Sequence, residues 1–288
     1  MFNKILVCYD GSREAENAVK VSGNLAKKFG SSIHAVYVAP DFKGFMDSIS
    51  VEERNIFTNW IDKNLIRKQT ANLDNIKKKL AKRRITFSYD ILNGLPYIEI
   101  LKYVKKNQFG MVALGKGRFN KNNILGGTAL KLIKNSDIPI LIVGGTINSD
   151  NMKNVLLPTD IFQFLKKDLD YARGISGKFK STIHLFNVVE TGDHNIPVEV
   201  LESMKGSSYN SLSEYITRQK LGNRFSPVVR VAKNAWIGIN DYVNDNKIDI
   251  MLLNTYGGKK IRTEHIGSIA EKVIEHSTCP VMAIPGKL

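Results

Sequence analysis

"GGTALKLIKNSDIPILIVGG", residues 126–145, joins a glycine pair to an apolar pattern of helical period and then to a short apolar run. The stretch "IGSIAEKVIEHSTCPVMAIPG", residues 266–286, repeats this order near the other end of the chain. We align Gly127-Thr128 with Gly267-Ser268, at an offset of 140 residues. Repetition at so long a period indicates two duplicated domains rather than an array of small repeats.

The beginnings of the two copies also match. "KILVCYDGS" and "NVLLPTDIF" place Asp10 and Asp160 at an offset of 150, and "SIHAVYVAP" and "TIHLFNVVE" share that offset. Between the copies, residues 144–153 are polar, contain glycine and lack periodicity, which is typical of a linker. We therefore expect one domain over residues 1–146 and a second over residues 147–288.

Strand patterns alternate with helix patterns inside each copy. The first copy predicts strands at residues 5–9, 33–38, 85–91, 111–114 and 138–143, and helices at residues 14–29, 51–82 (with room for a break), 97–107 and 128–134. Strict alternation implies parallel strands with helices on both faces. The predicted fold is α/β, with two tandem doubly wound five-stranded parallel sheets. Ligands of such sheets bind at the carboxyl ends of the strands.

The loop "LGKGRFNKNNILGGTAL", residues 114–130, has the composition of a phosphate site. Glycines allow main-chain amides to approach phosphate oxygens, and the helix that follows adds its amino-terminal amides. Lys116, Arg118 and Lys121 would strengthen the preference for an anion. The alternative is a surface turn with no ligand.

Asp10 and Asp160 each follow the first strand of a copy. A carboxylate there can accept hydrogen bonds from a base amino group or a ribose hydroxyl. Its alternative role is structural, because Asp10 or Ser12 could cap the helix that follows. The residue pattern alone leaves both roles open.

These motifs together resemble a tandem universal stress protein, over nearly the whole chain. The family's first strand ends in Pro-Thr-Asp, which "LLPTD" reproduces in the second copy. The family's phosphate loop is Gly-x-x-Gly, nine residues, then Gly-Ser/Thr. Gly257 and Gly267-Ser268 keep the nine-residue spacing, and so do Gly117 and Gly127-Thr128. The resemblance implies the adenine nucleotide alpha hydrolase-like form of the α/β fold.

Both copies depart from the family pattern. Asn254 replaces the first loop glycine of the second copy, and Phe162 stands where serine usually follows the aspartate. In the first copy Cys8-Tyr9 replaces Pro-Thr, and the opening glycines, Gly115 and Gly117, are one residue closer together. The first copy keeps Asp10-Gly11-Ser12 and a glycine pair, so we expect it to be the better binder.

The resemblance also implies a ligand and the residues that hold it. The ligand would be ATP, with AMP or ADP as alternatives and magnesium only through the nucleotide. Asp10 and the Val38 main chain would hold adenine and ribose, and Gly115, Gly117, Gly127 and Thr128 would hold the phosphates. The corresponding second set is Asp160, Val188, Gly257, Gly267 and Ser268.

Composition and charge bear on two other classes of protein, nucleic-acid binders and membrane proteins. The chain carries 42 basic and 27 acidic residues, a net charge of +15, and nine of the basic residues fall within residues 62–84. That segment reads as a solvated basic helix in preference to a nucleic-acid site, because no nucleic-acid-binding motif accompanies it. No stretch is long enough to span a membrane and no leader pattern opens the chain, so we expect a cytoplasmic protein.

No constellation of catalytic side chains recurs in both copies, although slow ATP hydrolysis stays open. A nucleotide-binding regulatory protein is therefore the favoured function. The alternatives are a member that has lost nucleotide and acts through protein contacts, and a basic nucleic-acid binder. In single-domain relatives the last strands pair across a dimer interface. We accordingly expect residues 138–143 and 281–284 to face each other in one chain as a pseudo-dimer, with a homodimer of chains left open.

Overall fold

The computed structural model describes residues 1–117, 125–144, 151–160, 166–255 and 266–286. The first half contains β1 (Lys4–Cys8), α1 (Arg13–Phe29), β2 (Ser32–Ala39), α2 (Lys43–Asp47), α3 (Val51–Ile61), η1 (Asp62–Ile66), α4 (Arg67–Lys82), β3 (Phe87–Asn93), α5 (Pro96–Lys106), β4 (Met111–Gly115), α6 (Gly127–Asn135) and β5 (Ile140–Val143). The second half contains β6 (Asn154–Pro158), α7 (Lys166–Phe179), β7 (Thr182–Glu190), α8 (Val198–Arg218), β8 (Phe225–Ala232), α9 (Ala235–Asp245), β9 (Ile250–Asn254), α10 (Ser268–His276) and β10 (Val281–Ile284). The predicted boundary near Thr146 lies outside the described residues.

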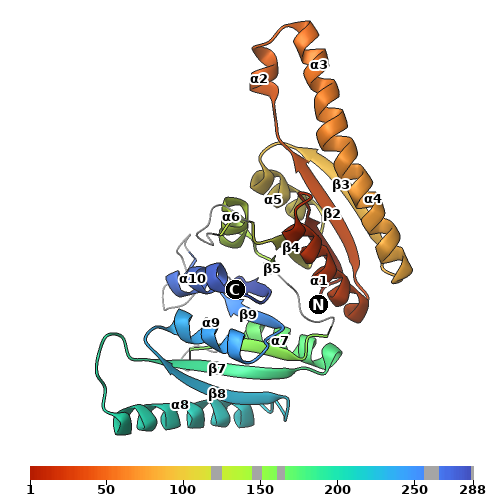
Figure 1. Ribbon diagram of the computed structural model, residues 1–288. Coiled ribbons are helices and arrows are strands. Elements are labelled where there is room, and N and C mark those ends of the chain that lie inside the picture. Colours follow the sequence, from red (N-terminus) through yellow and green to blue (C-terminus); the bar gives the residue numbers. More distant parts are fainter. Residues whose placement is uncertain (118–124, 145–150, 161–165, 256–265, 287–288) are drawn as a thin grey trace.

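The strands form one continuous sheet in the order β3-β2-β1-β4-β5-β10-β9-β6-β7-β8. All neighbours are parallel except β5 and β10, which pair antiparallel with Leu141 opposite Met282. The predicted facing of the last strands is therefore confirmed, and it merges the two five-stranded sheets into one. The order of strands reverses beside β1 and beside β6, which gives each half its own switch point (Figure 1).

Alternate strand residues send side chains to two separate hydrophobic cores. Ile5 and Val7 of β1 join one core with residues of α1, α4, α7 and α8, whereas Leu6 joins the other with residues of α5, α6, α9 and α10. Helices therefore cover both faces of the sheet, as the alternating pattern predicts.

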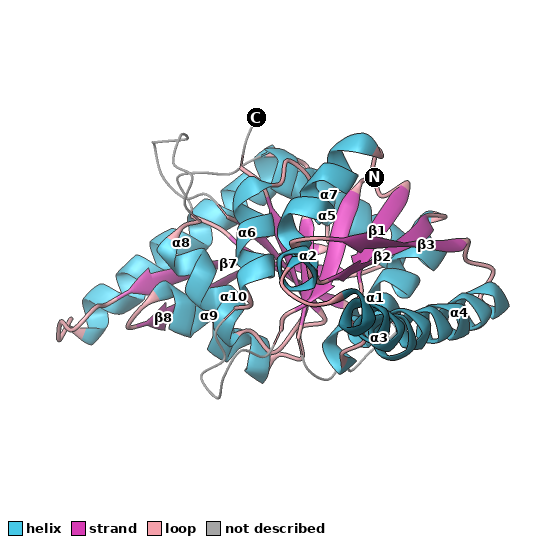
Figure 2. Cartoon of the chain, turned by 90° about the horizontal axis from the view of Figure 1, so that it is seen from above, coloured by secondary structure: helices cyan, strands magenta, loops and turns pink. Residues whose placement is uncertain are grey.

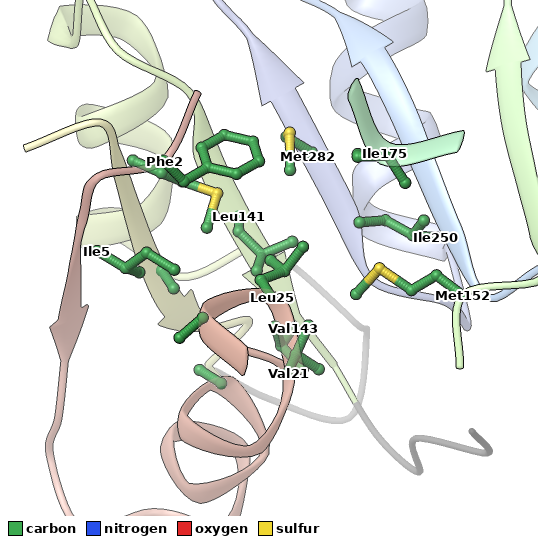
Figure 3. Close-up of a cluster of buried hydrophobic side chains, with 14 of the residues drawn as sticks. Phe2, Ile5, Val21, Leu25, Leu141, Val143, Met152, Ile175, Ile250 and Met282 are labelled. Atoms are coloured by element: carbon green, nitrogen blue, oxygen red, sulfur yellow. The ribbon is translucent and has the colours of Figure 1, made fainter. Parts of the chain in front are cut away.

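The two halves share the first of these cores. Figure 3 shows Leu141 and Met282 at the strand junction, with side chains of α1 and α7 on the same face. The Phe2 ring stacks on the Tyr171 ring of α7, with centroids 5.7 Å apart. Burial of these apolar surfaces against each other fixes the position of one half relative to the other.

Residues 51–82 are helical throughout, so the break that the sequence left open is absent there and a π-helical turn stands in the middle instead. Ser50 and Glu53 form a reciprocal capping box that starts α3, and η1 is a π-helical turn between α3 and α4. Only α4 buries side chains, namely Leu73, Ile76 and Leu80. The short helix α2 is not predicted by the sequence pattern; it lies beside α3 in both views (Figure 2).

Candidate functional site

In the turn after β1, Asp10 and Ser12 make different hydrogen bonds. The Ser12 hydroxyl caps α1 by accepting from the Ala15 amide at 3.1 Å. The exposed Asp10 carboxylate accepts from the Ser12 amide at 2.9 Å, which orders the turn. Ser12 is therefore the N-cap of α1. Asp10 stabilises the turn through its hydrogen bond with the Ser12 amide, and its carboxylate is exposed at the edge of the sheet where the strands end.

A side chain of α4 lies over this turn in the first domain. The Gln69 Nε2 atom donates to the Asp10 carbonyl at 3.5 Å. Gly11 has a φ of +81°, and a Cβ there would lie 2.6 Å from Gln69 Nε2. The positive φ favours glycine in this turn, whereas the Gln69 carboxamide is the end of a flexible side chain that could shift. Gln69 narrows the space beside Asp10, where the resemblance places adenosine.

The glycine loop of the first domain is described only at its two ends. A Cβ on Gly115 would lie 2.8 Å from the main-chain carbon of Glu14, so this glycine is needed for the packing of β4 against α1. Gly117 has a φ of +74°, and the Gly126 amide donates to the Lys116 carbonyl at 3.3 Å. Arg118 and Lys121 lie outside the described residues.

The Lys116 side chain contacts the second domain. Its Nζ donates to the Glu275 carbonyl and, at 3.3 Å, to the Ser277 carbonyl, both at the carboxyl end of α10 in the second domain. Burial lowers the pKa of this ammonium group. The expectation that Lys116 attracts a phosphate is therefore wrong, because its charge interacts with the negative end of a helix in the other domain.

The two phosphate-loop helices, α6 and α10, start in equivalent ways. Gly126 and Gly267 are their N-caps, and because glycine has no side chain, no cap side chain accepts from the first amides of either helix. This equivalence corresponds to an offset of 141, so Gly127 matches Ser268 and the offset of 140 is one residue too small. Ser136 and Ser277, the C-caps of the two helices, are also 141 residues apart, and this serine pair is the sequence feature that indicates the correct alignment. Gly126 is thus a candidate that our sequence alignment missed.

Val38 and Thr128 are the remaining predicted residues of the first domain. Val38 lies one residue before the end of β2, partly buried and packed on the second core. Thr128 is partly buried in the first turn of α6, next to the exposed Gly127. A Cβ on Gly127 would meet no atom within 4 Å, so packing within the protein does not require glycine there.

Four of the five predicted residues of the second domain line one open cleft of about 1670 Å³. They are Asp160, Val188, Gly267 and Ser268, and they come from the ends of three chain segments that parallel topology brings to one edge. Gly257 lies outside the described residues. The wall opposite α10 includes Ser203, Ser207 and Ser211 of α8. This volume exceeds the 300–1,000 Å³ that is usual for small-molecule sites.

Asn254, which replaces the first loop glycine, has a partner in the same cleft. Its Nδ2 lies 3.3 Å from each carboxylate oxygen of Asp168 on α7. Burial raises the pKa of Asp168 to about 6, and the hydrogen bond from Asn254 offsets part of that shift. The first domain has Gly115 and the fully buried Ala18 at the corresponding positions, so the second domain has exchanged two small residues for a polar pair.

Helix α7 adds charged residues to the cleft that the sequence argument did not identify. Lys166 and Arg173 line it together with Asp168, and acidic groups on other elements make its charge mixed. A nucleotide has a hydrogen-bonding base and sugar at one end and phosphates at the other, so it requires mixed polarity of this kind. The sequence gives little indication that these residues line a ligand site, because charged residues of an amphipathic helix usually face water.

Two further classes of site were sought in the described parts of the chain. No three His, Cys, Asp or Glu residues there lie close enough to hold a metal ion. No helix among those parts has the length and hydropathy that crossing a bilayer requires. His34 is a core residue, bonded to Ser88 at 2.7 Å and Tyr103 at 2.8 Å, as its place on a strand indicates.

Comparison with known proteins gives the same family for both halves. The sequence model of the universal stress protein family matches residues 1–144 and again residues 151–285. Universal stress protein Slr1230 of Synechocystis is 23% identical over 297 aligned positions, covering 96% of this chain and 98% of that protein. Universal stress protein YxiE of Bacillus subtilis is 27% identical over 147 residues, covering 50% of this chain and 99% of that protein.

Solved structures share the fold over the whole chain. A universal stress protein from Archaeoglobus fulgidus has a TM-score of 0.70 at 18% identity, covering 99% of both chains. A protein of unknown function from Pseudomonas aeruginosa has a TM-score of 0.69 at 14% identity, covering 99% of this chain and 92% of that one. Two family matches in succession and a shared fold over both domains lead to one conclusion: the chain belongs to the universal stress protein family, as a tandem, two-domain member.

Proposed function

We propose that this protein is a regulatory binder of an adenine nucleotide, with ATP as the first candidate and AMP or ADP as alternatives. The observation that carries the proposal is the cleft of the second domain, which gathers Asp160, Val188, Gly267 and Ser268 at one carboxyl edge. The proposal comprises binding alone and assigns no catalytic residue.

Each part of the nucleotide has a chemically suitable group in this cleft. Helix α10 starts at Gly267 without a capping side chain, so its first amides and the Ser268 hydroxyl can donate to phosphate oxygens. The helix dipole favours negative charge at the same place. The Asp160 carboxylate and the Val188 main chain stand where base and ribose hydroxyls would be recognised, since an exposed carboxylate accepts such hydrogen bonds.

The described geometry supports the second domain better than the first, which reverses the order of preference that the sequence suggested. In the first domain Gln69 lies over the turn that carries Asp10, and Lys116 is bonded to α10 instead of facing a ligand. Residues 116–126 join β4 to α6, whereas residues 255–267 join β9 to α10, so the first loop is two residues shorter. A shorter loop leaves less main chain to surround a triphosphate.

Calorimetric titration of ATP into matched variants of the two domains tests the proposal. Asp160→Ala removes an acceptor for the adenosine part, and we expect a loss of about 1–3 kcal/mol, which is roughly 5- to 150-fold in affinity. Gly267→Val places a branched side chain at the phosphate end and should weaken binding further. Asp10→Ala and Gly126→Val, at the positions that match Asp160 and Gly267, are the controls in the first domain, and we expect small effects.

The alternatives give different results. If the first-domain variants abolish binding and the second-domain variants do not, the nucleotide occupies the other edge. If wild-type protein binds no adenine nucleotide at millimolar concentration, this member has lost the ligand and acts through protein contacts.

A further inference from the structure

The segment from the end of β2 to the first residues of α4 forms an arm, which we define as residues 41–68. Neither α2 nor α3 nor η1 contains a buried residue. The arm extends beyond the carboxyl end of β2, away from the rest of the sheet (Figure 1). Helix α3 continues through η1 into α4, but only α4 buries side chains in the domain core, so the end of the arm depends on contacts of its own.

The inner face of α3 packs on other aromatic residues of the arm. The Phe57 ring contacts the rings of Phe42, Phe45 and Trp60, with centroid distances of 5.2, 4.9 and 5.9 Å. This aromatic cluster holds α2 against α3. Trp60 lies at the edge of this cluster and is still half exposed, and no helix or strand of the described residues covers the face of α3 beyond it.

The outer face of the arm carries a stripe of five exposed residues, Glu52, Ile56, Trp60, Lys63 and Arg67, which we call the outer stripe. Their spacing of four, four, three and four residues places them along one side of a helix. Ile56 is 71% exposed and Trp60 is 49% exposed. The stripe therefore begins with an acid, continues with two large apolar side chains and ends with two bases.

When two copies of the outer stripe run in opposite directions, the acidic end of each copy faces the basic end of the other. Two copies of the stripe packed antiparallel about a twofold axis place Ile56 of one copy against Trp60 of the other. The same arrangement places Glu52 of each copy near Lys63 of the other. We propose that the outer stripe is a self-association surface, which pairs the arms of two chains in a symmetric dimer.

The charge of the arm favours a second copy over a lipid surface. Residues 41–68 contain five acidic and five basic side chains, so the arm is neutral although the chain carries +15. Helices that lie on anionic bilayers combine an apolar face with an excess of Lys and Arg. The basic surplus of this chain lies beyond the arm, towards the end of α4, at residues 77–84.

Sedimentation velocity across a range of protein concentration tests the proposal. One pair of helices buries little area, so we expect a dimer with a dissociation constant in the micromolar range. Trp60→Glu should raise that constant at least tenfold, because it puts a charge at the centre of the contact. The matched control is Val198→Glu, at a 69% exposed residue of α8 in the other domain, which should sediment like wild type.

Charge reversal keeps the proposal testable even if Trp60→Glu loosens the aromatic cluster. Glu52→Lys and Lys63→Glu proteins should each be monomeric at concentrations where wild type dimerises, because both contacts become like-charged. An equimolar mixture should recover the dimer, because the mixed pair has one native contact and one contact in which both charges are exchanged. The double variant, Glu52→Lys with Lys63→Glu in one chain, should dimerise by itself.

Three results would overturn the inference. Wild-type protein could remain a monomer at hundreds of micromolar. A dimer could form that neither Trp60→Glu nor the charge reversals weaken. A monomer could instead bind vesicles of anionic lipid in a way that depends on Trp60, which would assign the arm to a membrane.

Discussion

Replacing Asp168 by Asn should stabilise this protein at neutral pH and have no stabilising effect at acid pH. Burial raises the pKa of this carboxyl from 3.8 to about 6, which means that the folded state prefers the protonated form. The unfolded chain ionises above pH 3.8, so the folded state loses stability as the pH rises towards 6. The full cost is present above pH 6, and about two pKa units correspond to about 3 kcal/mol.

Asparagine removes the charge and keeps an acceptor oxygen for the Asn254 amide, which now contacts both carboxylate oxygens. We therefore expect the free energy of unfolding to increase by up to about 3 kcal/mol at pH 7–8. The increase should decline between pH 6 and pH 4 and be absent below pH 4. Urea denaturation at a series of pH values measures it.

Asp170→Asn is the matched control, since Asp170 is exposed on the same helix. It removes the same charge from the same basic protein without relieving any burial, so it should change stability little at any pH. An equal gain at pH 4 and pH 8 for Asp168→Asn, or an equal gain for both variants, would refute the argument. The buried carboxylate should also repel a phosphate, so ATP should bind the second domain more tightly in Asp168→Asn and at pH values below 6.

Three further predictions concern other parts of the molecule. Lys116→Met should lower the free energy of unfolding by about 1–3 kcal/mol, because it leaves carbonyls at the end of α10 without a charged donor; an unchanged melting temperature would contradict this. Tyr103→Phe should cost about 1–2 kcal/mol by removing the hydroxyl that lies 2.8 Å from His34 Nε2 and donates to Asp90, and an unchanged melting temperature in calorimetry would contradict this. Double-stranded DNA and single-stranded RNA should show no specific binding by fluorescence anisotropy; micromolar affinity at physiological salt that is lost on neutralising residues 77–79 would overturn this.

The fold can be predicted from the sequence because the two patterns that indicate it, apolar periodicity and the alternation of strands with helices, are read from neighbouring residues. Apolar periodicity distinguishes strands from helices in each copy, and strict alternation leaves parallel topology as the solution. The apolar strands at the end of each copy need a covering strand, and each supplies the other's. The helix α2 escaped prediction because its five residues include a glycine and its position depends on the aromatic contact of Phe45 with Phe57.

The sequence predicts only those site residues whose positions are determined by the ends of the strands. Asp160, Val188 and Gly267 meet because carboxyl ends of parallel strands share one edge. The direction of Lys116 depends on how the two domains pack, and the position of Gln69 depends on how α4 crosses the sheet. Neither is encoded in a local pattern. The pairing of Asp168 with Asn254 joins residues 86 apart on different elements, and only packing reveals it.

The central claim, that this member binds an adenine nucleotide, is tested most directly by titrating ATP into the wild-type protein in a calorimeter. We predict saturable binding at the second-domain edge, with one strong site per chain that Asp160→Ala weakens by roughly 5- to 150-fold. Heat indistinguishable from dilution up to millimolar ATP, ADP and AMP would contradict the claim. The glycine loops would then be structural, and the protein would act through its contacts with other chains.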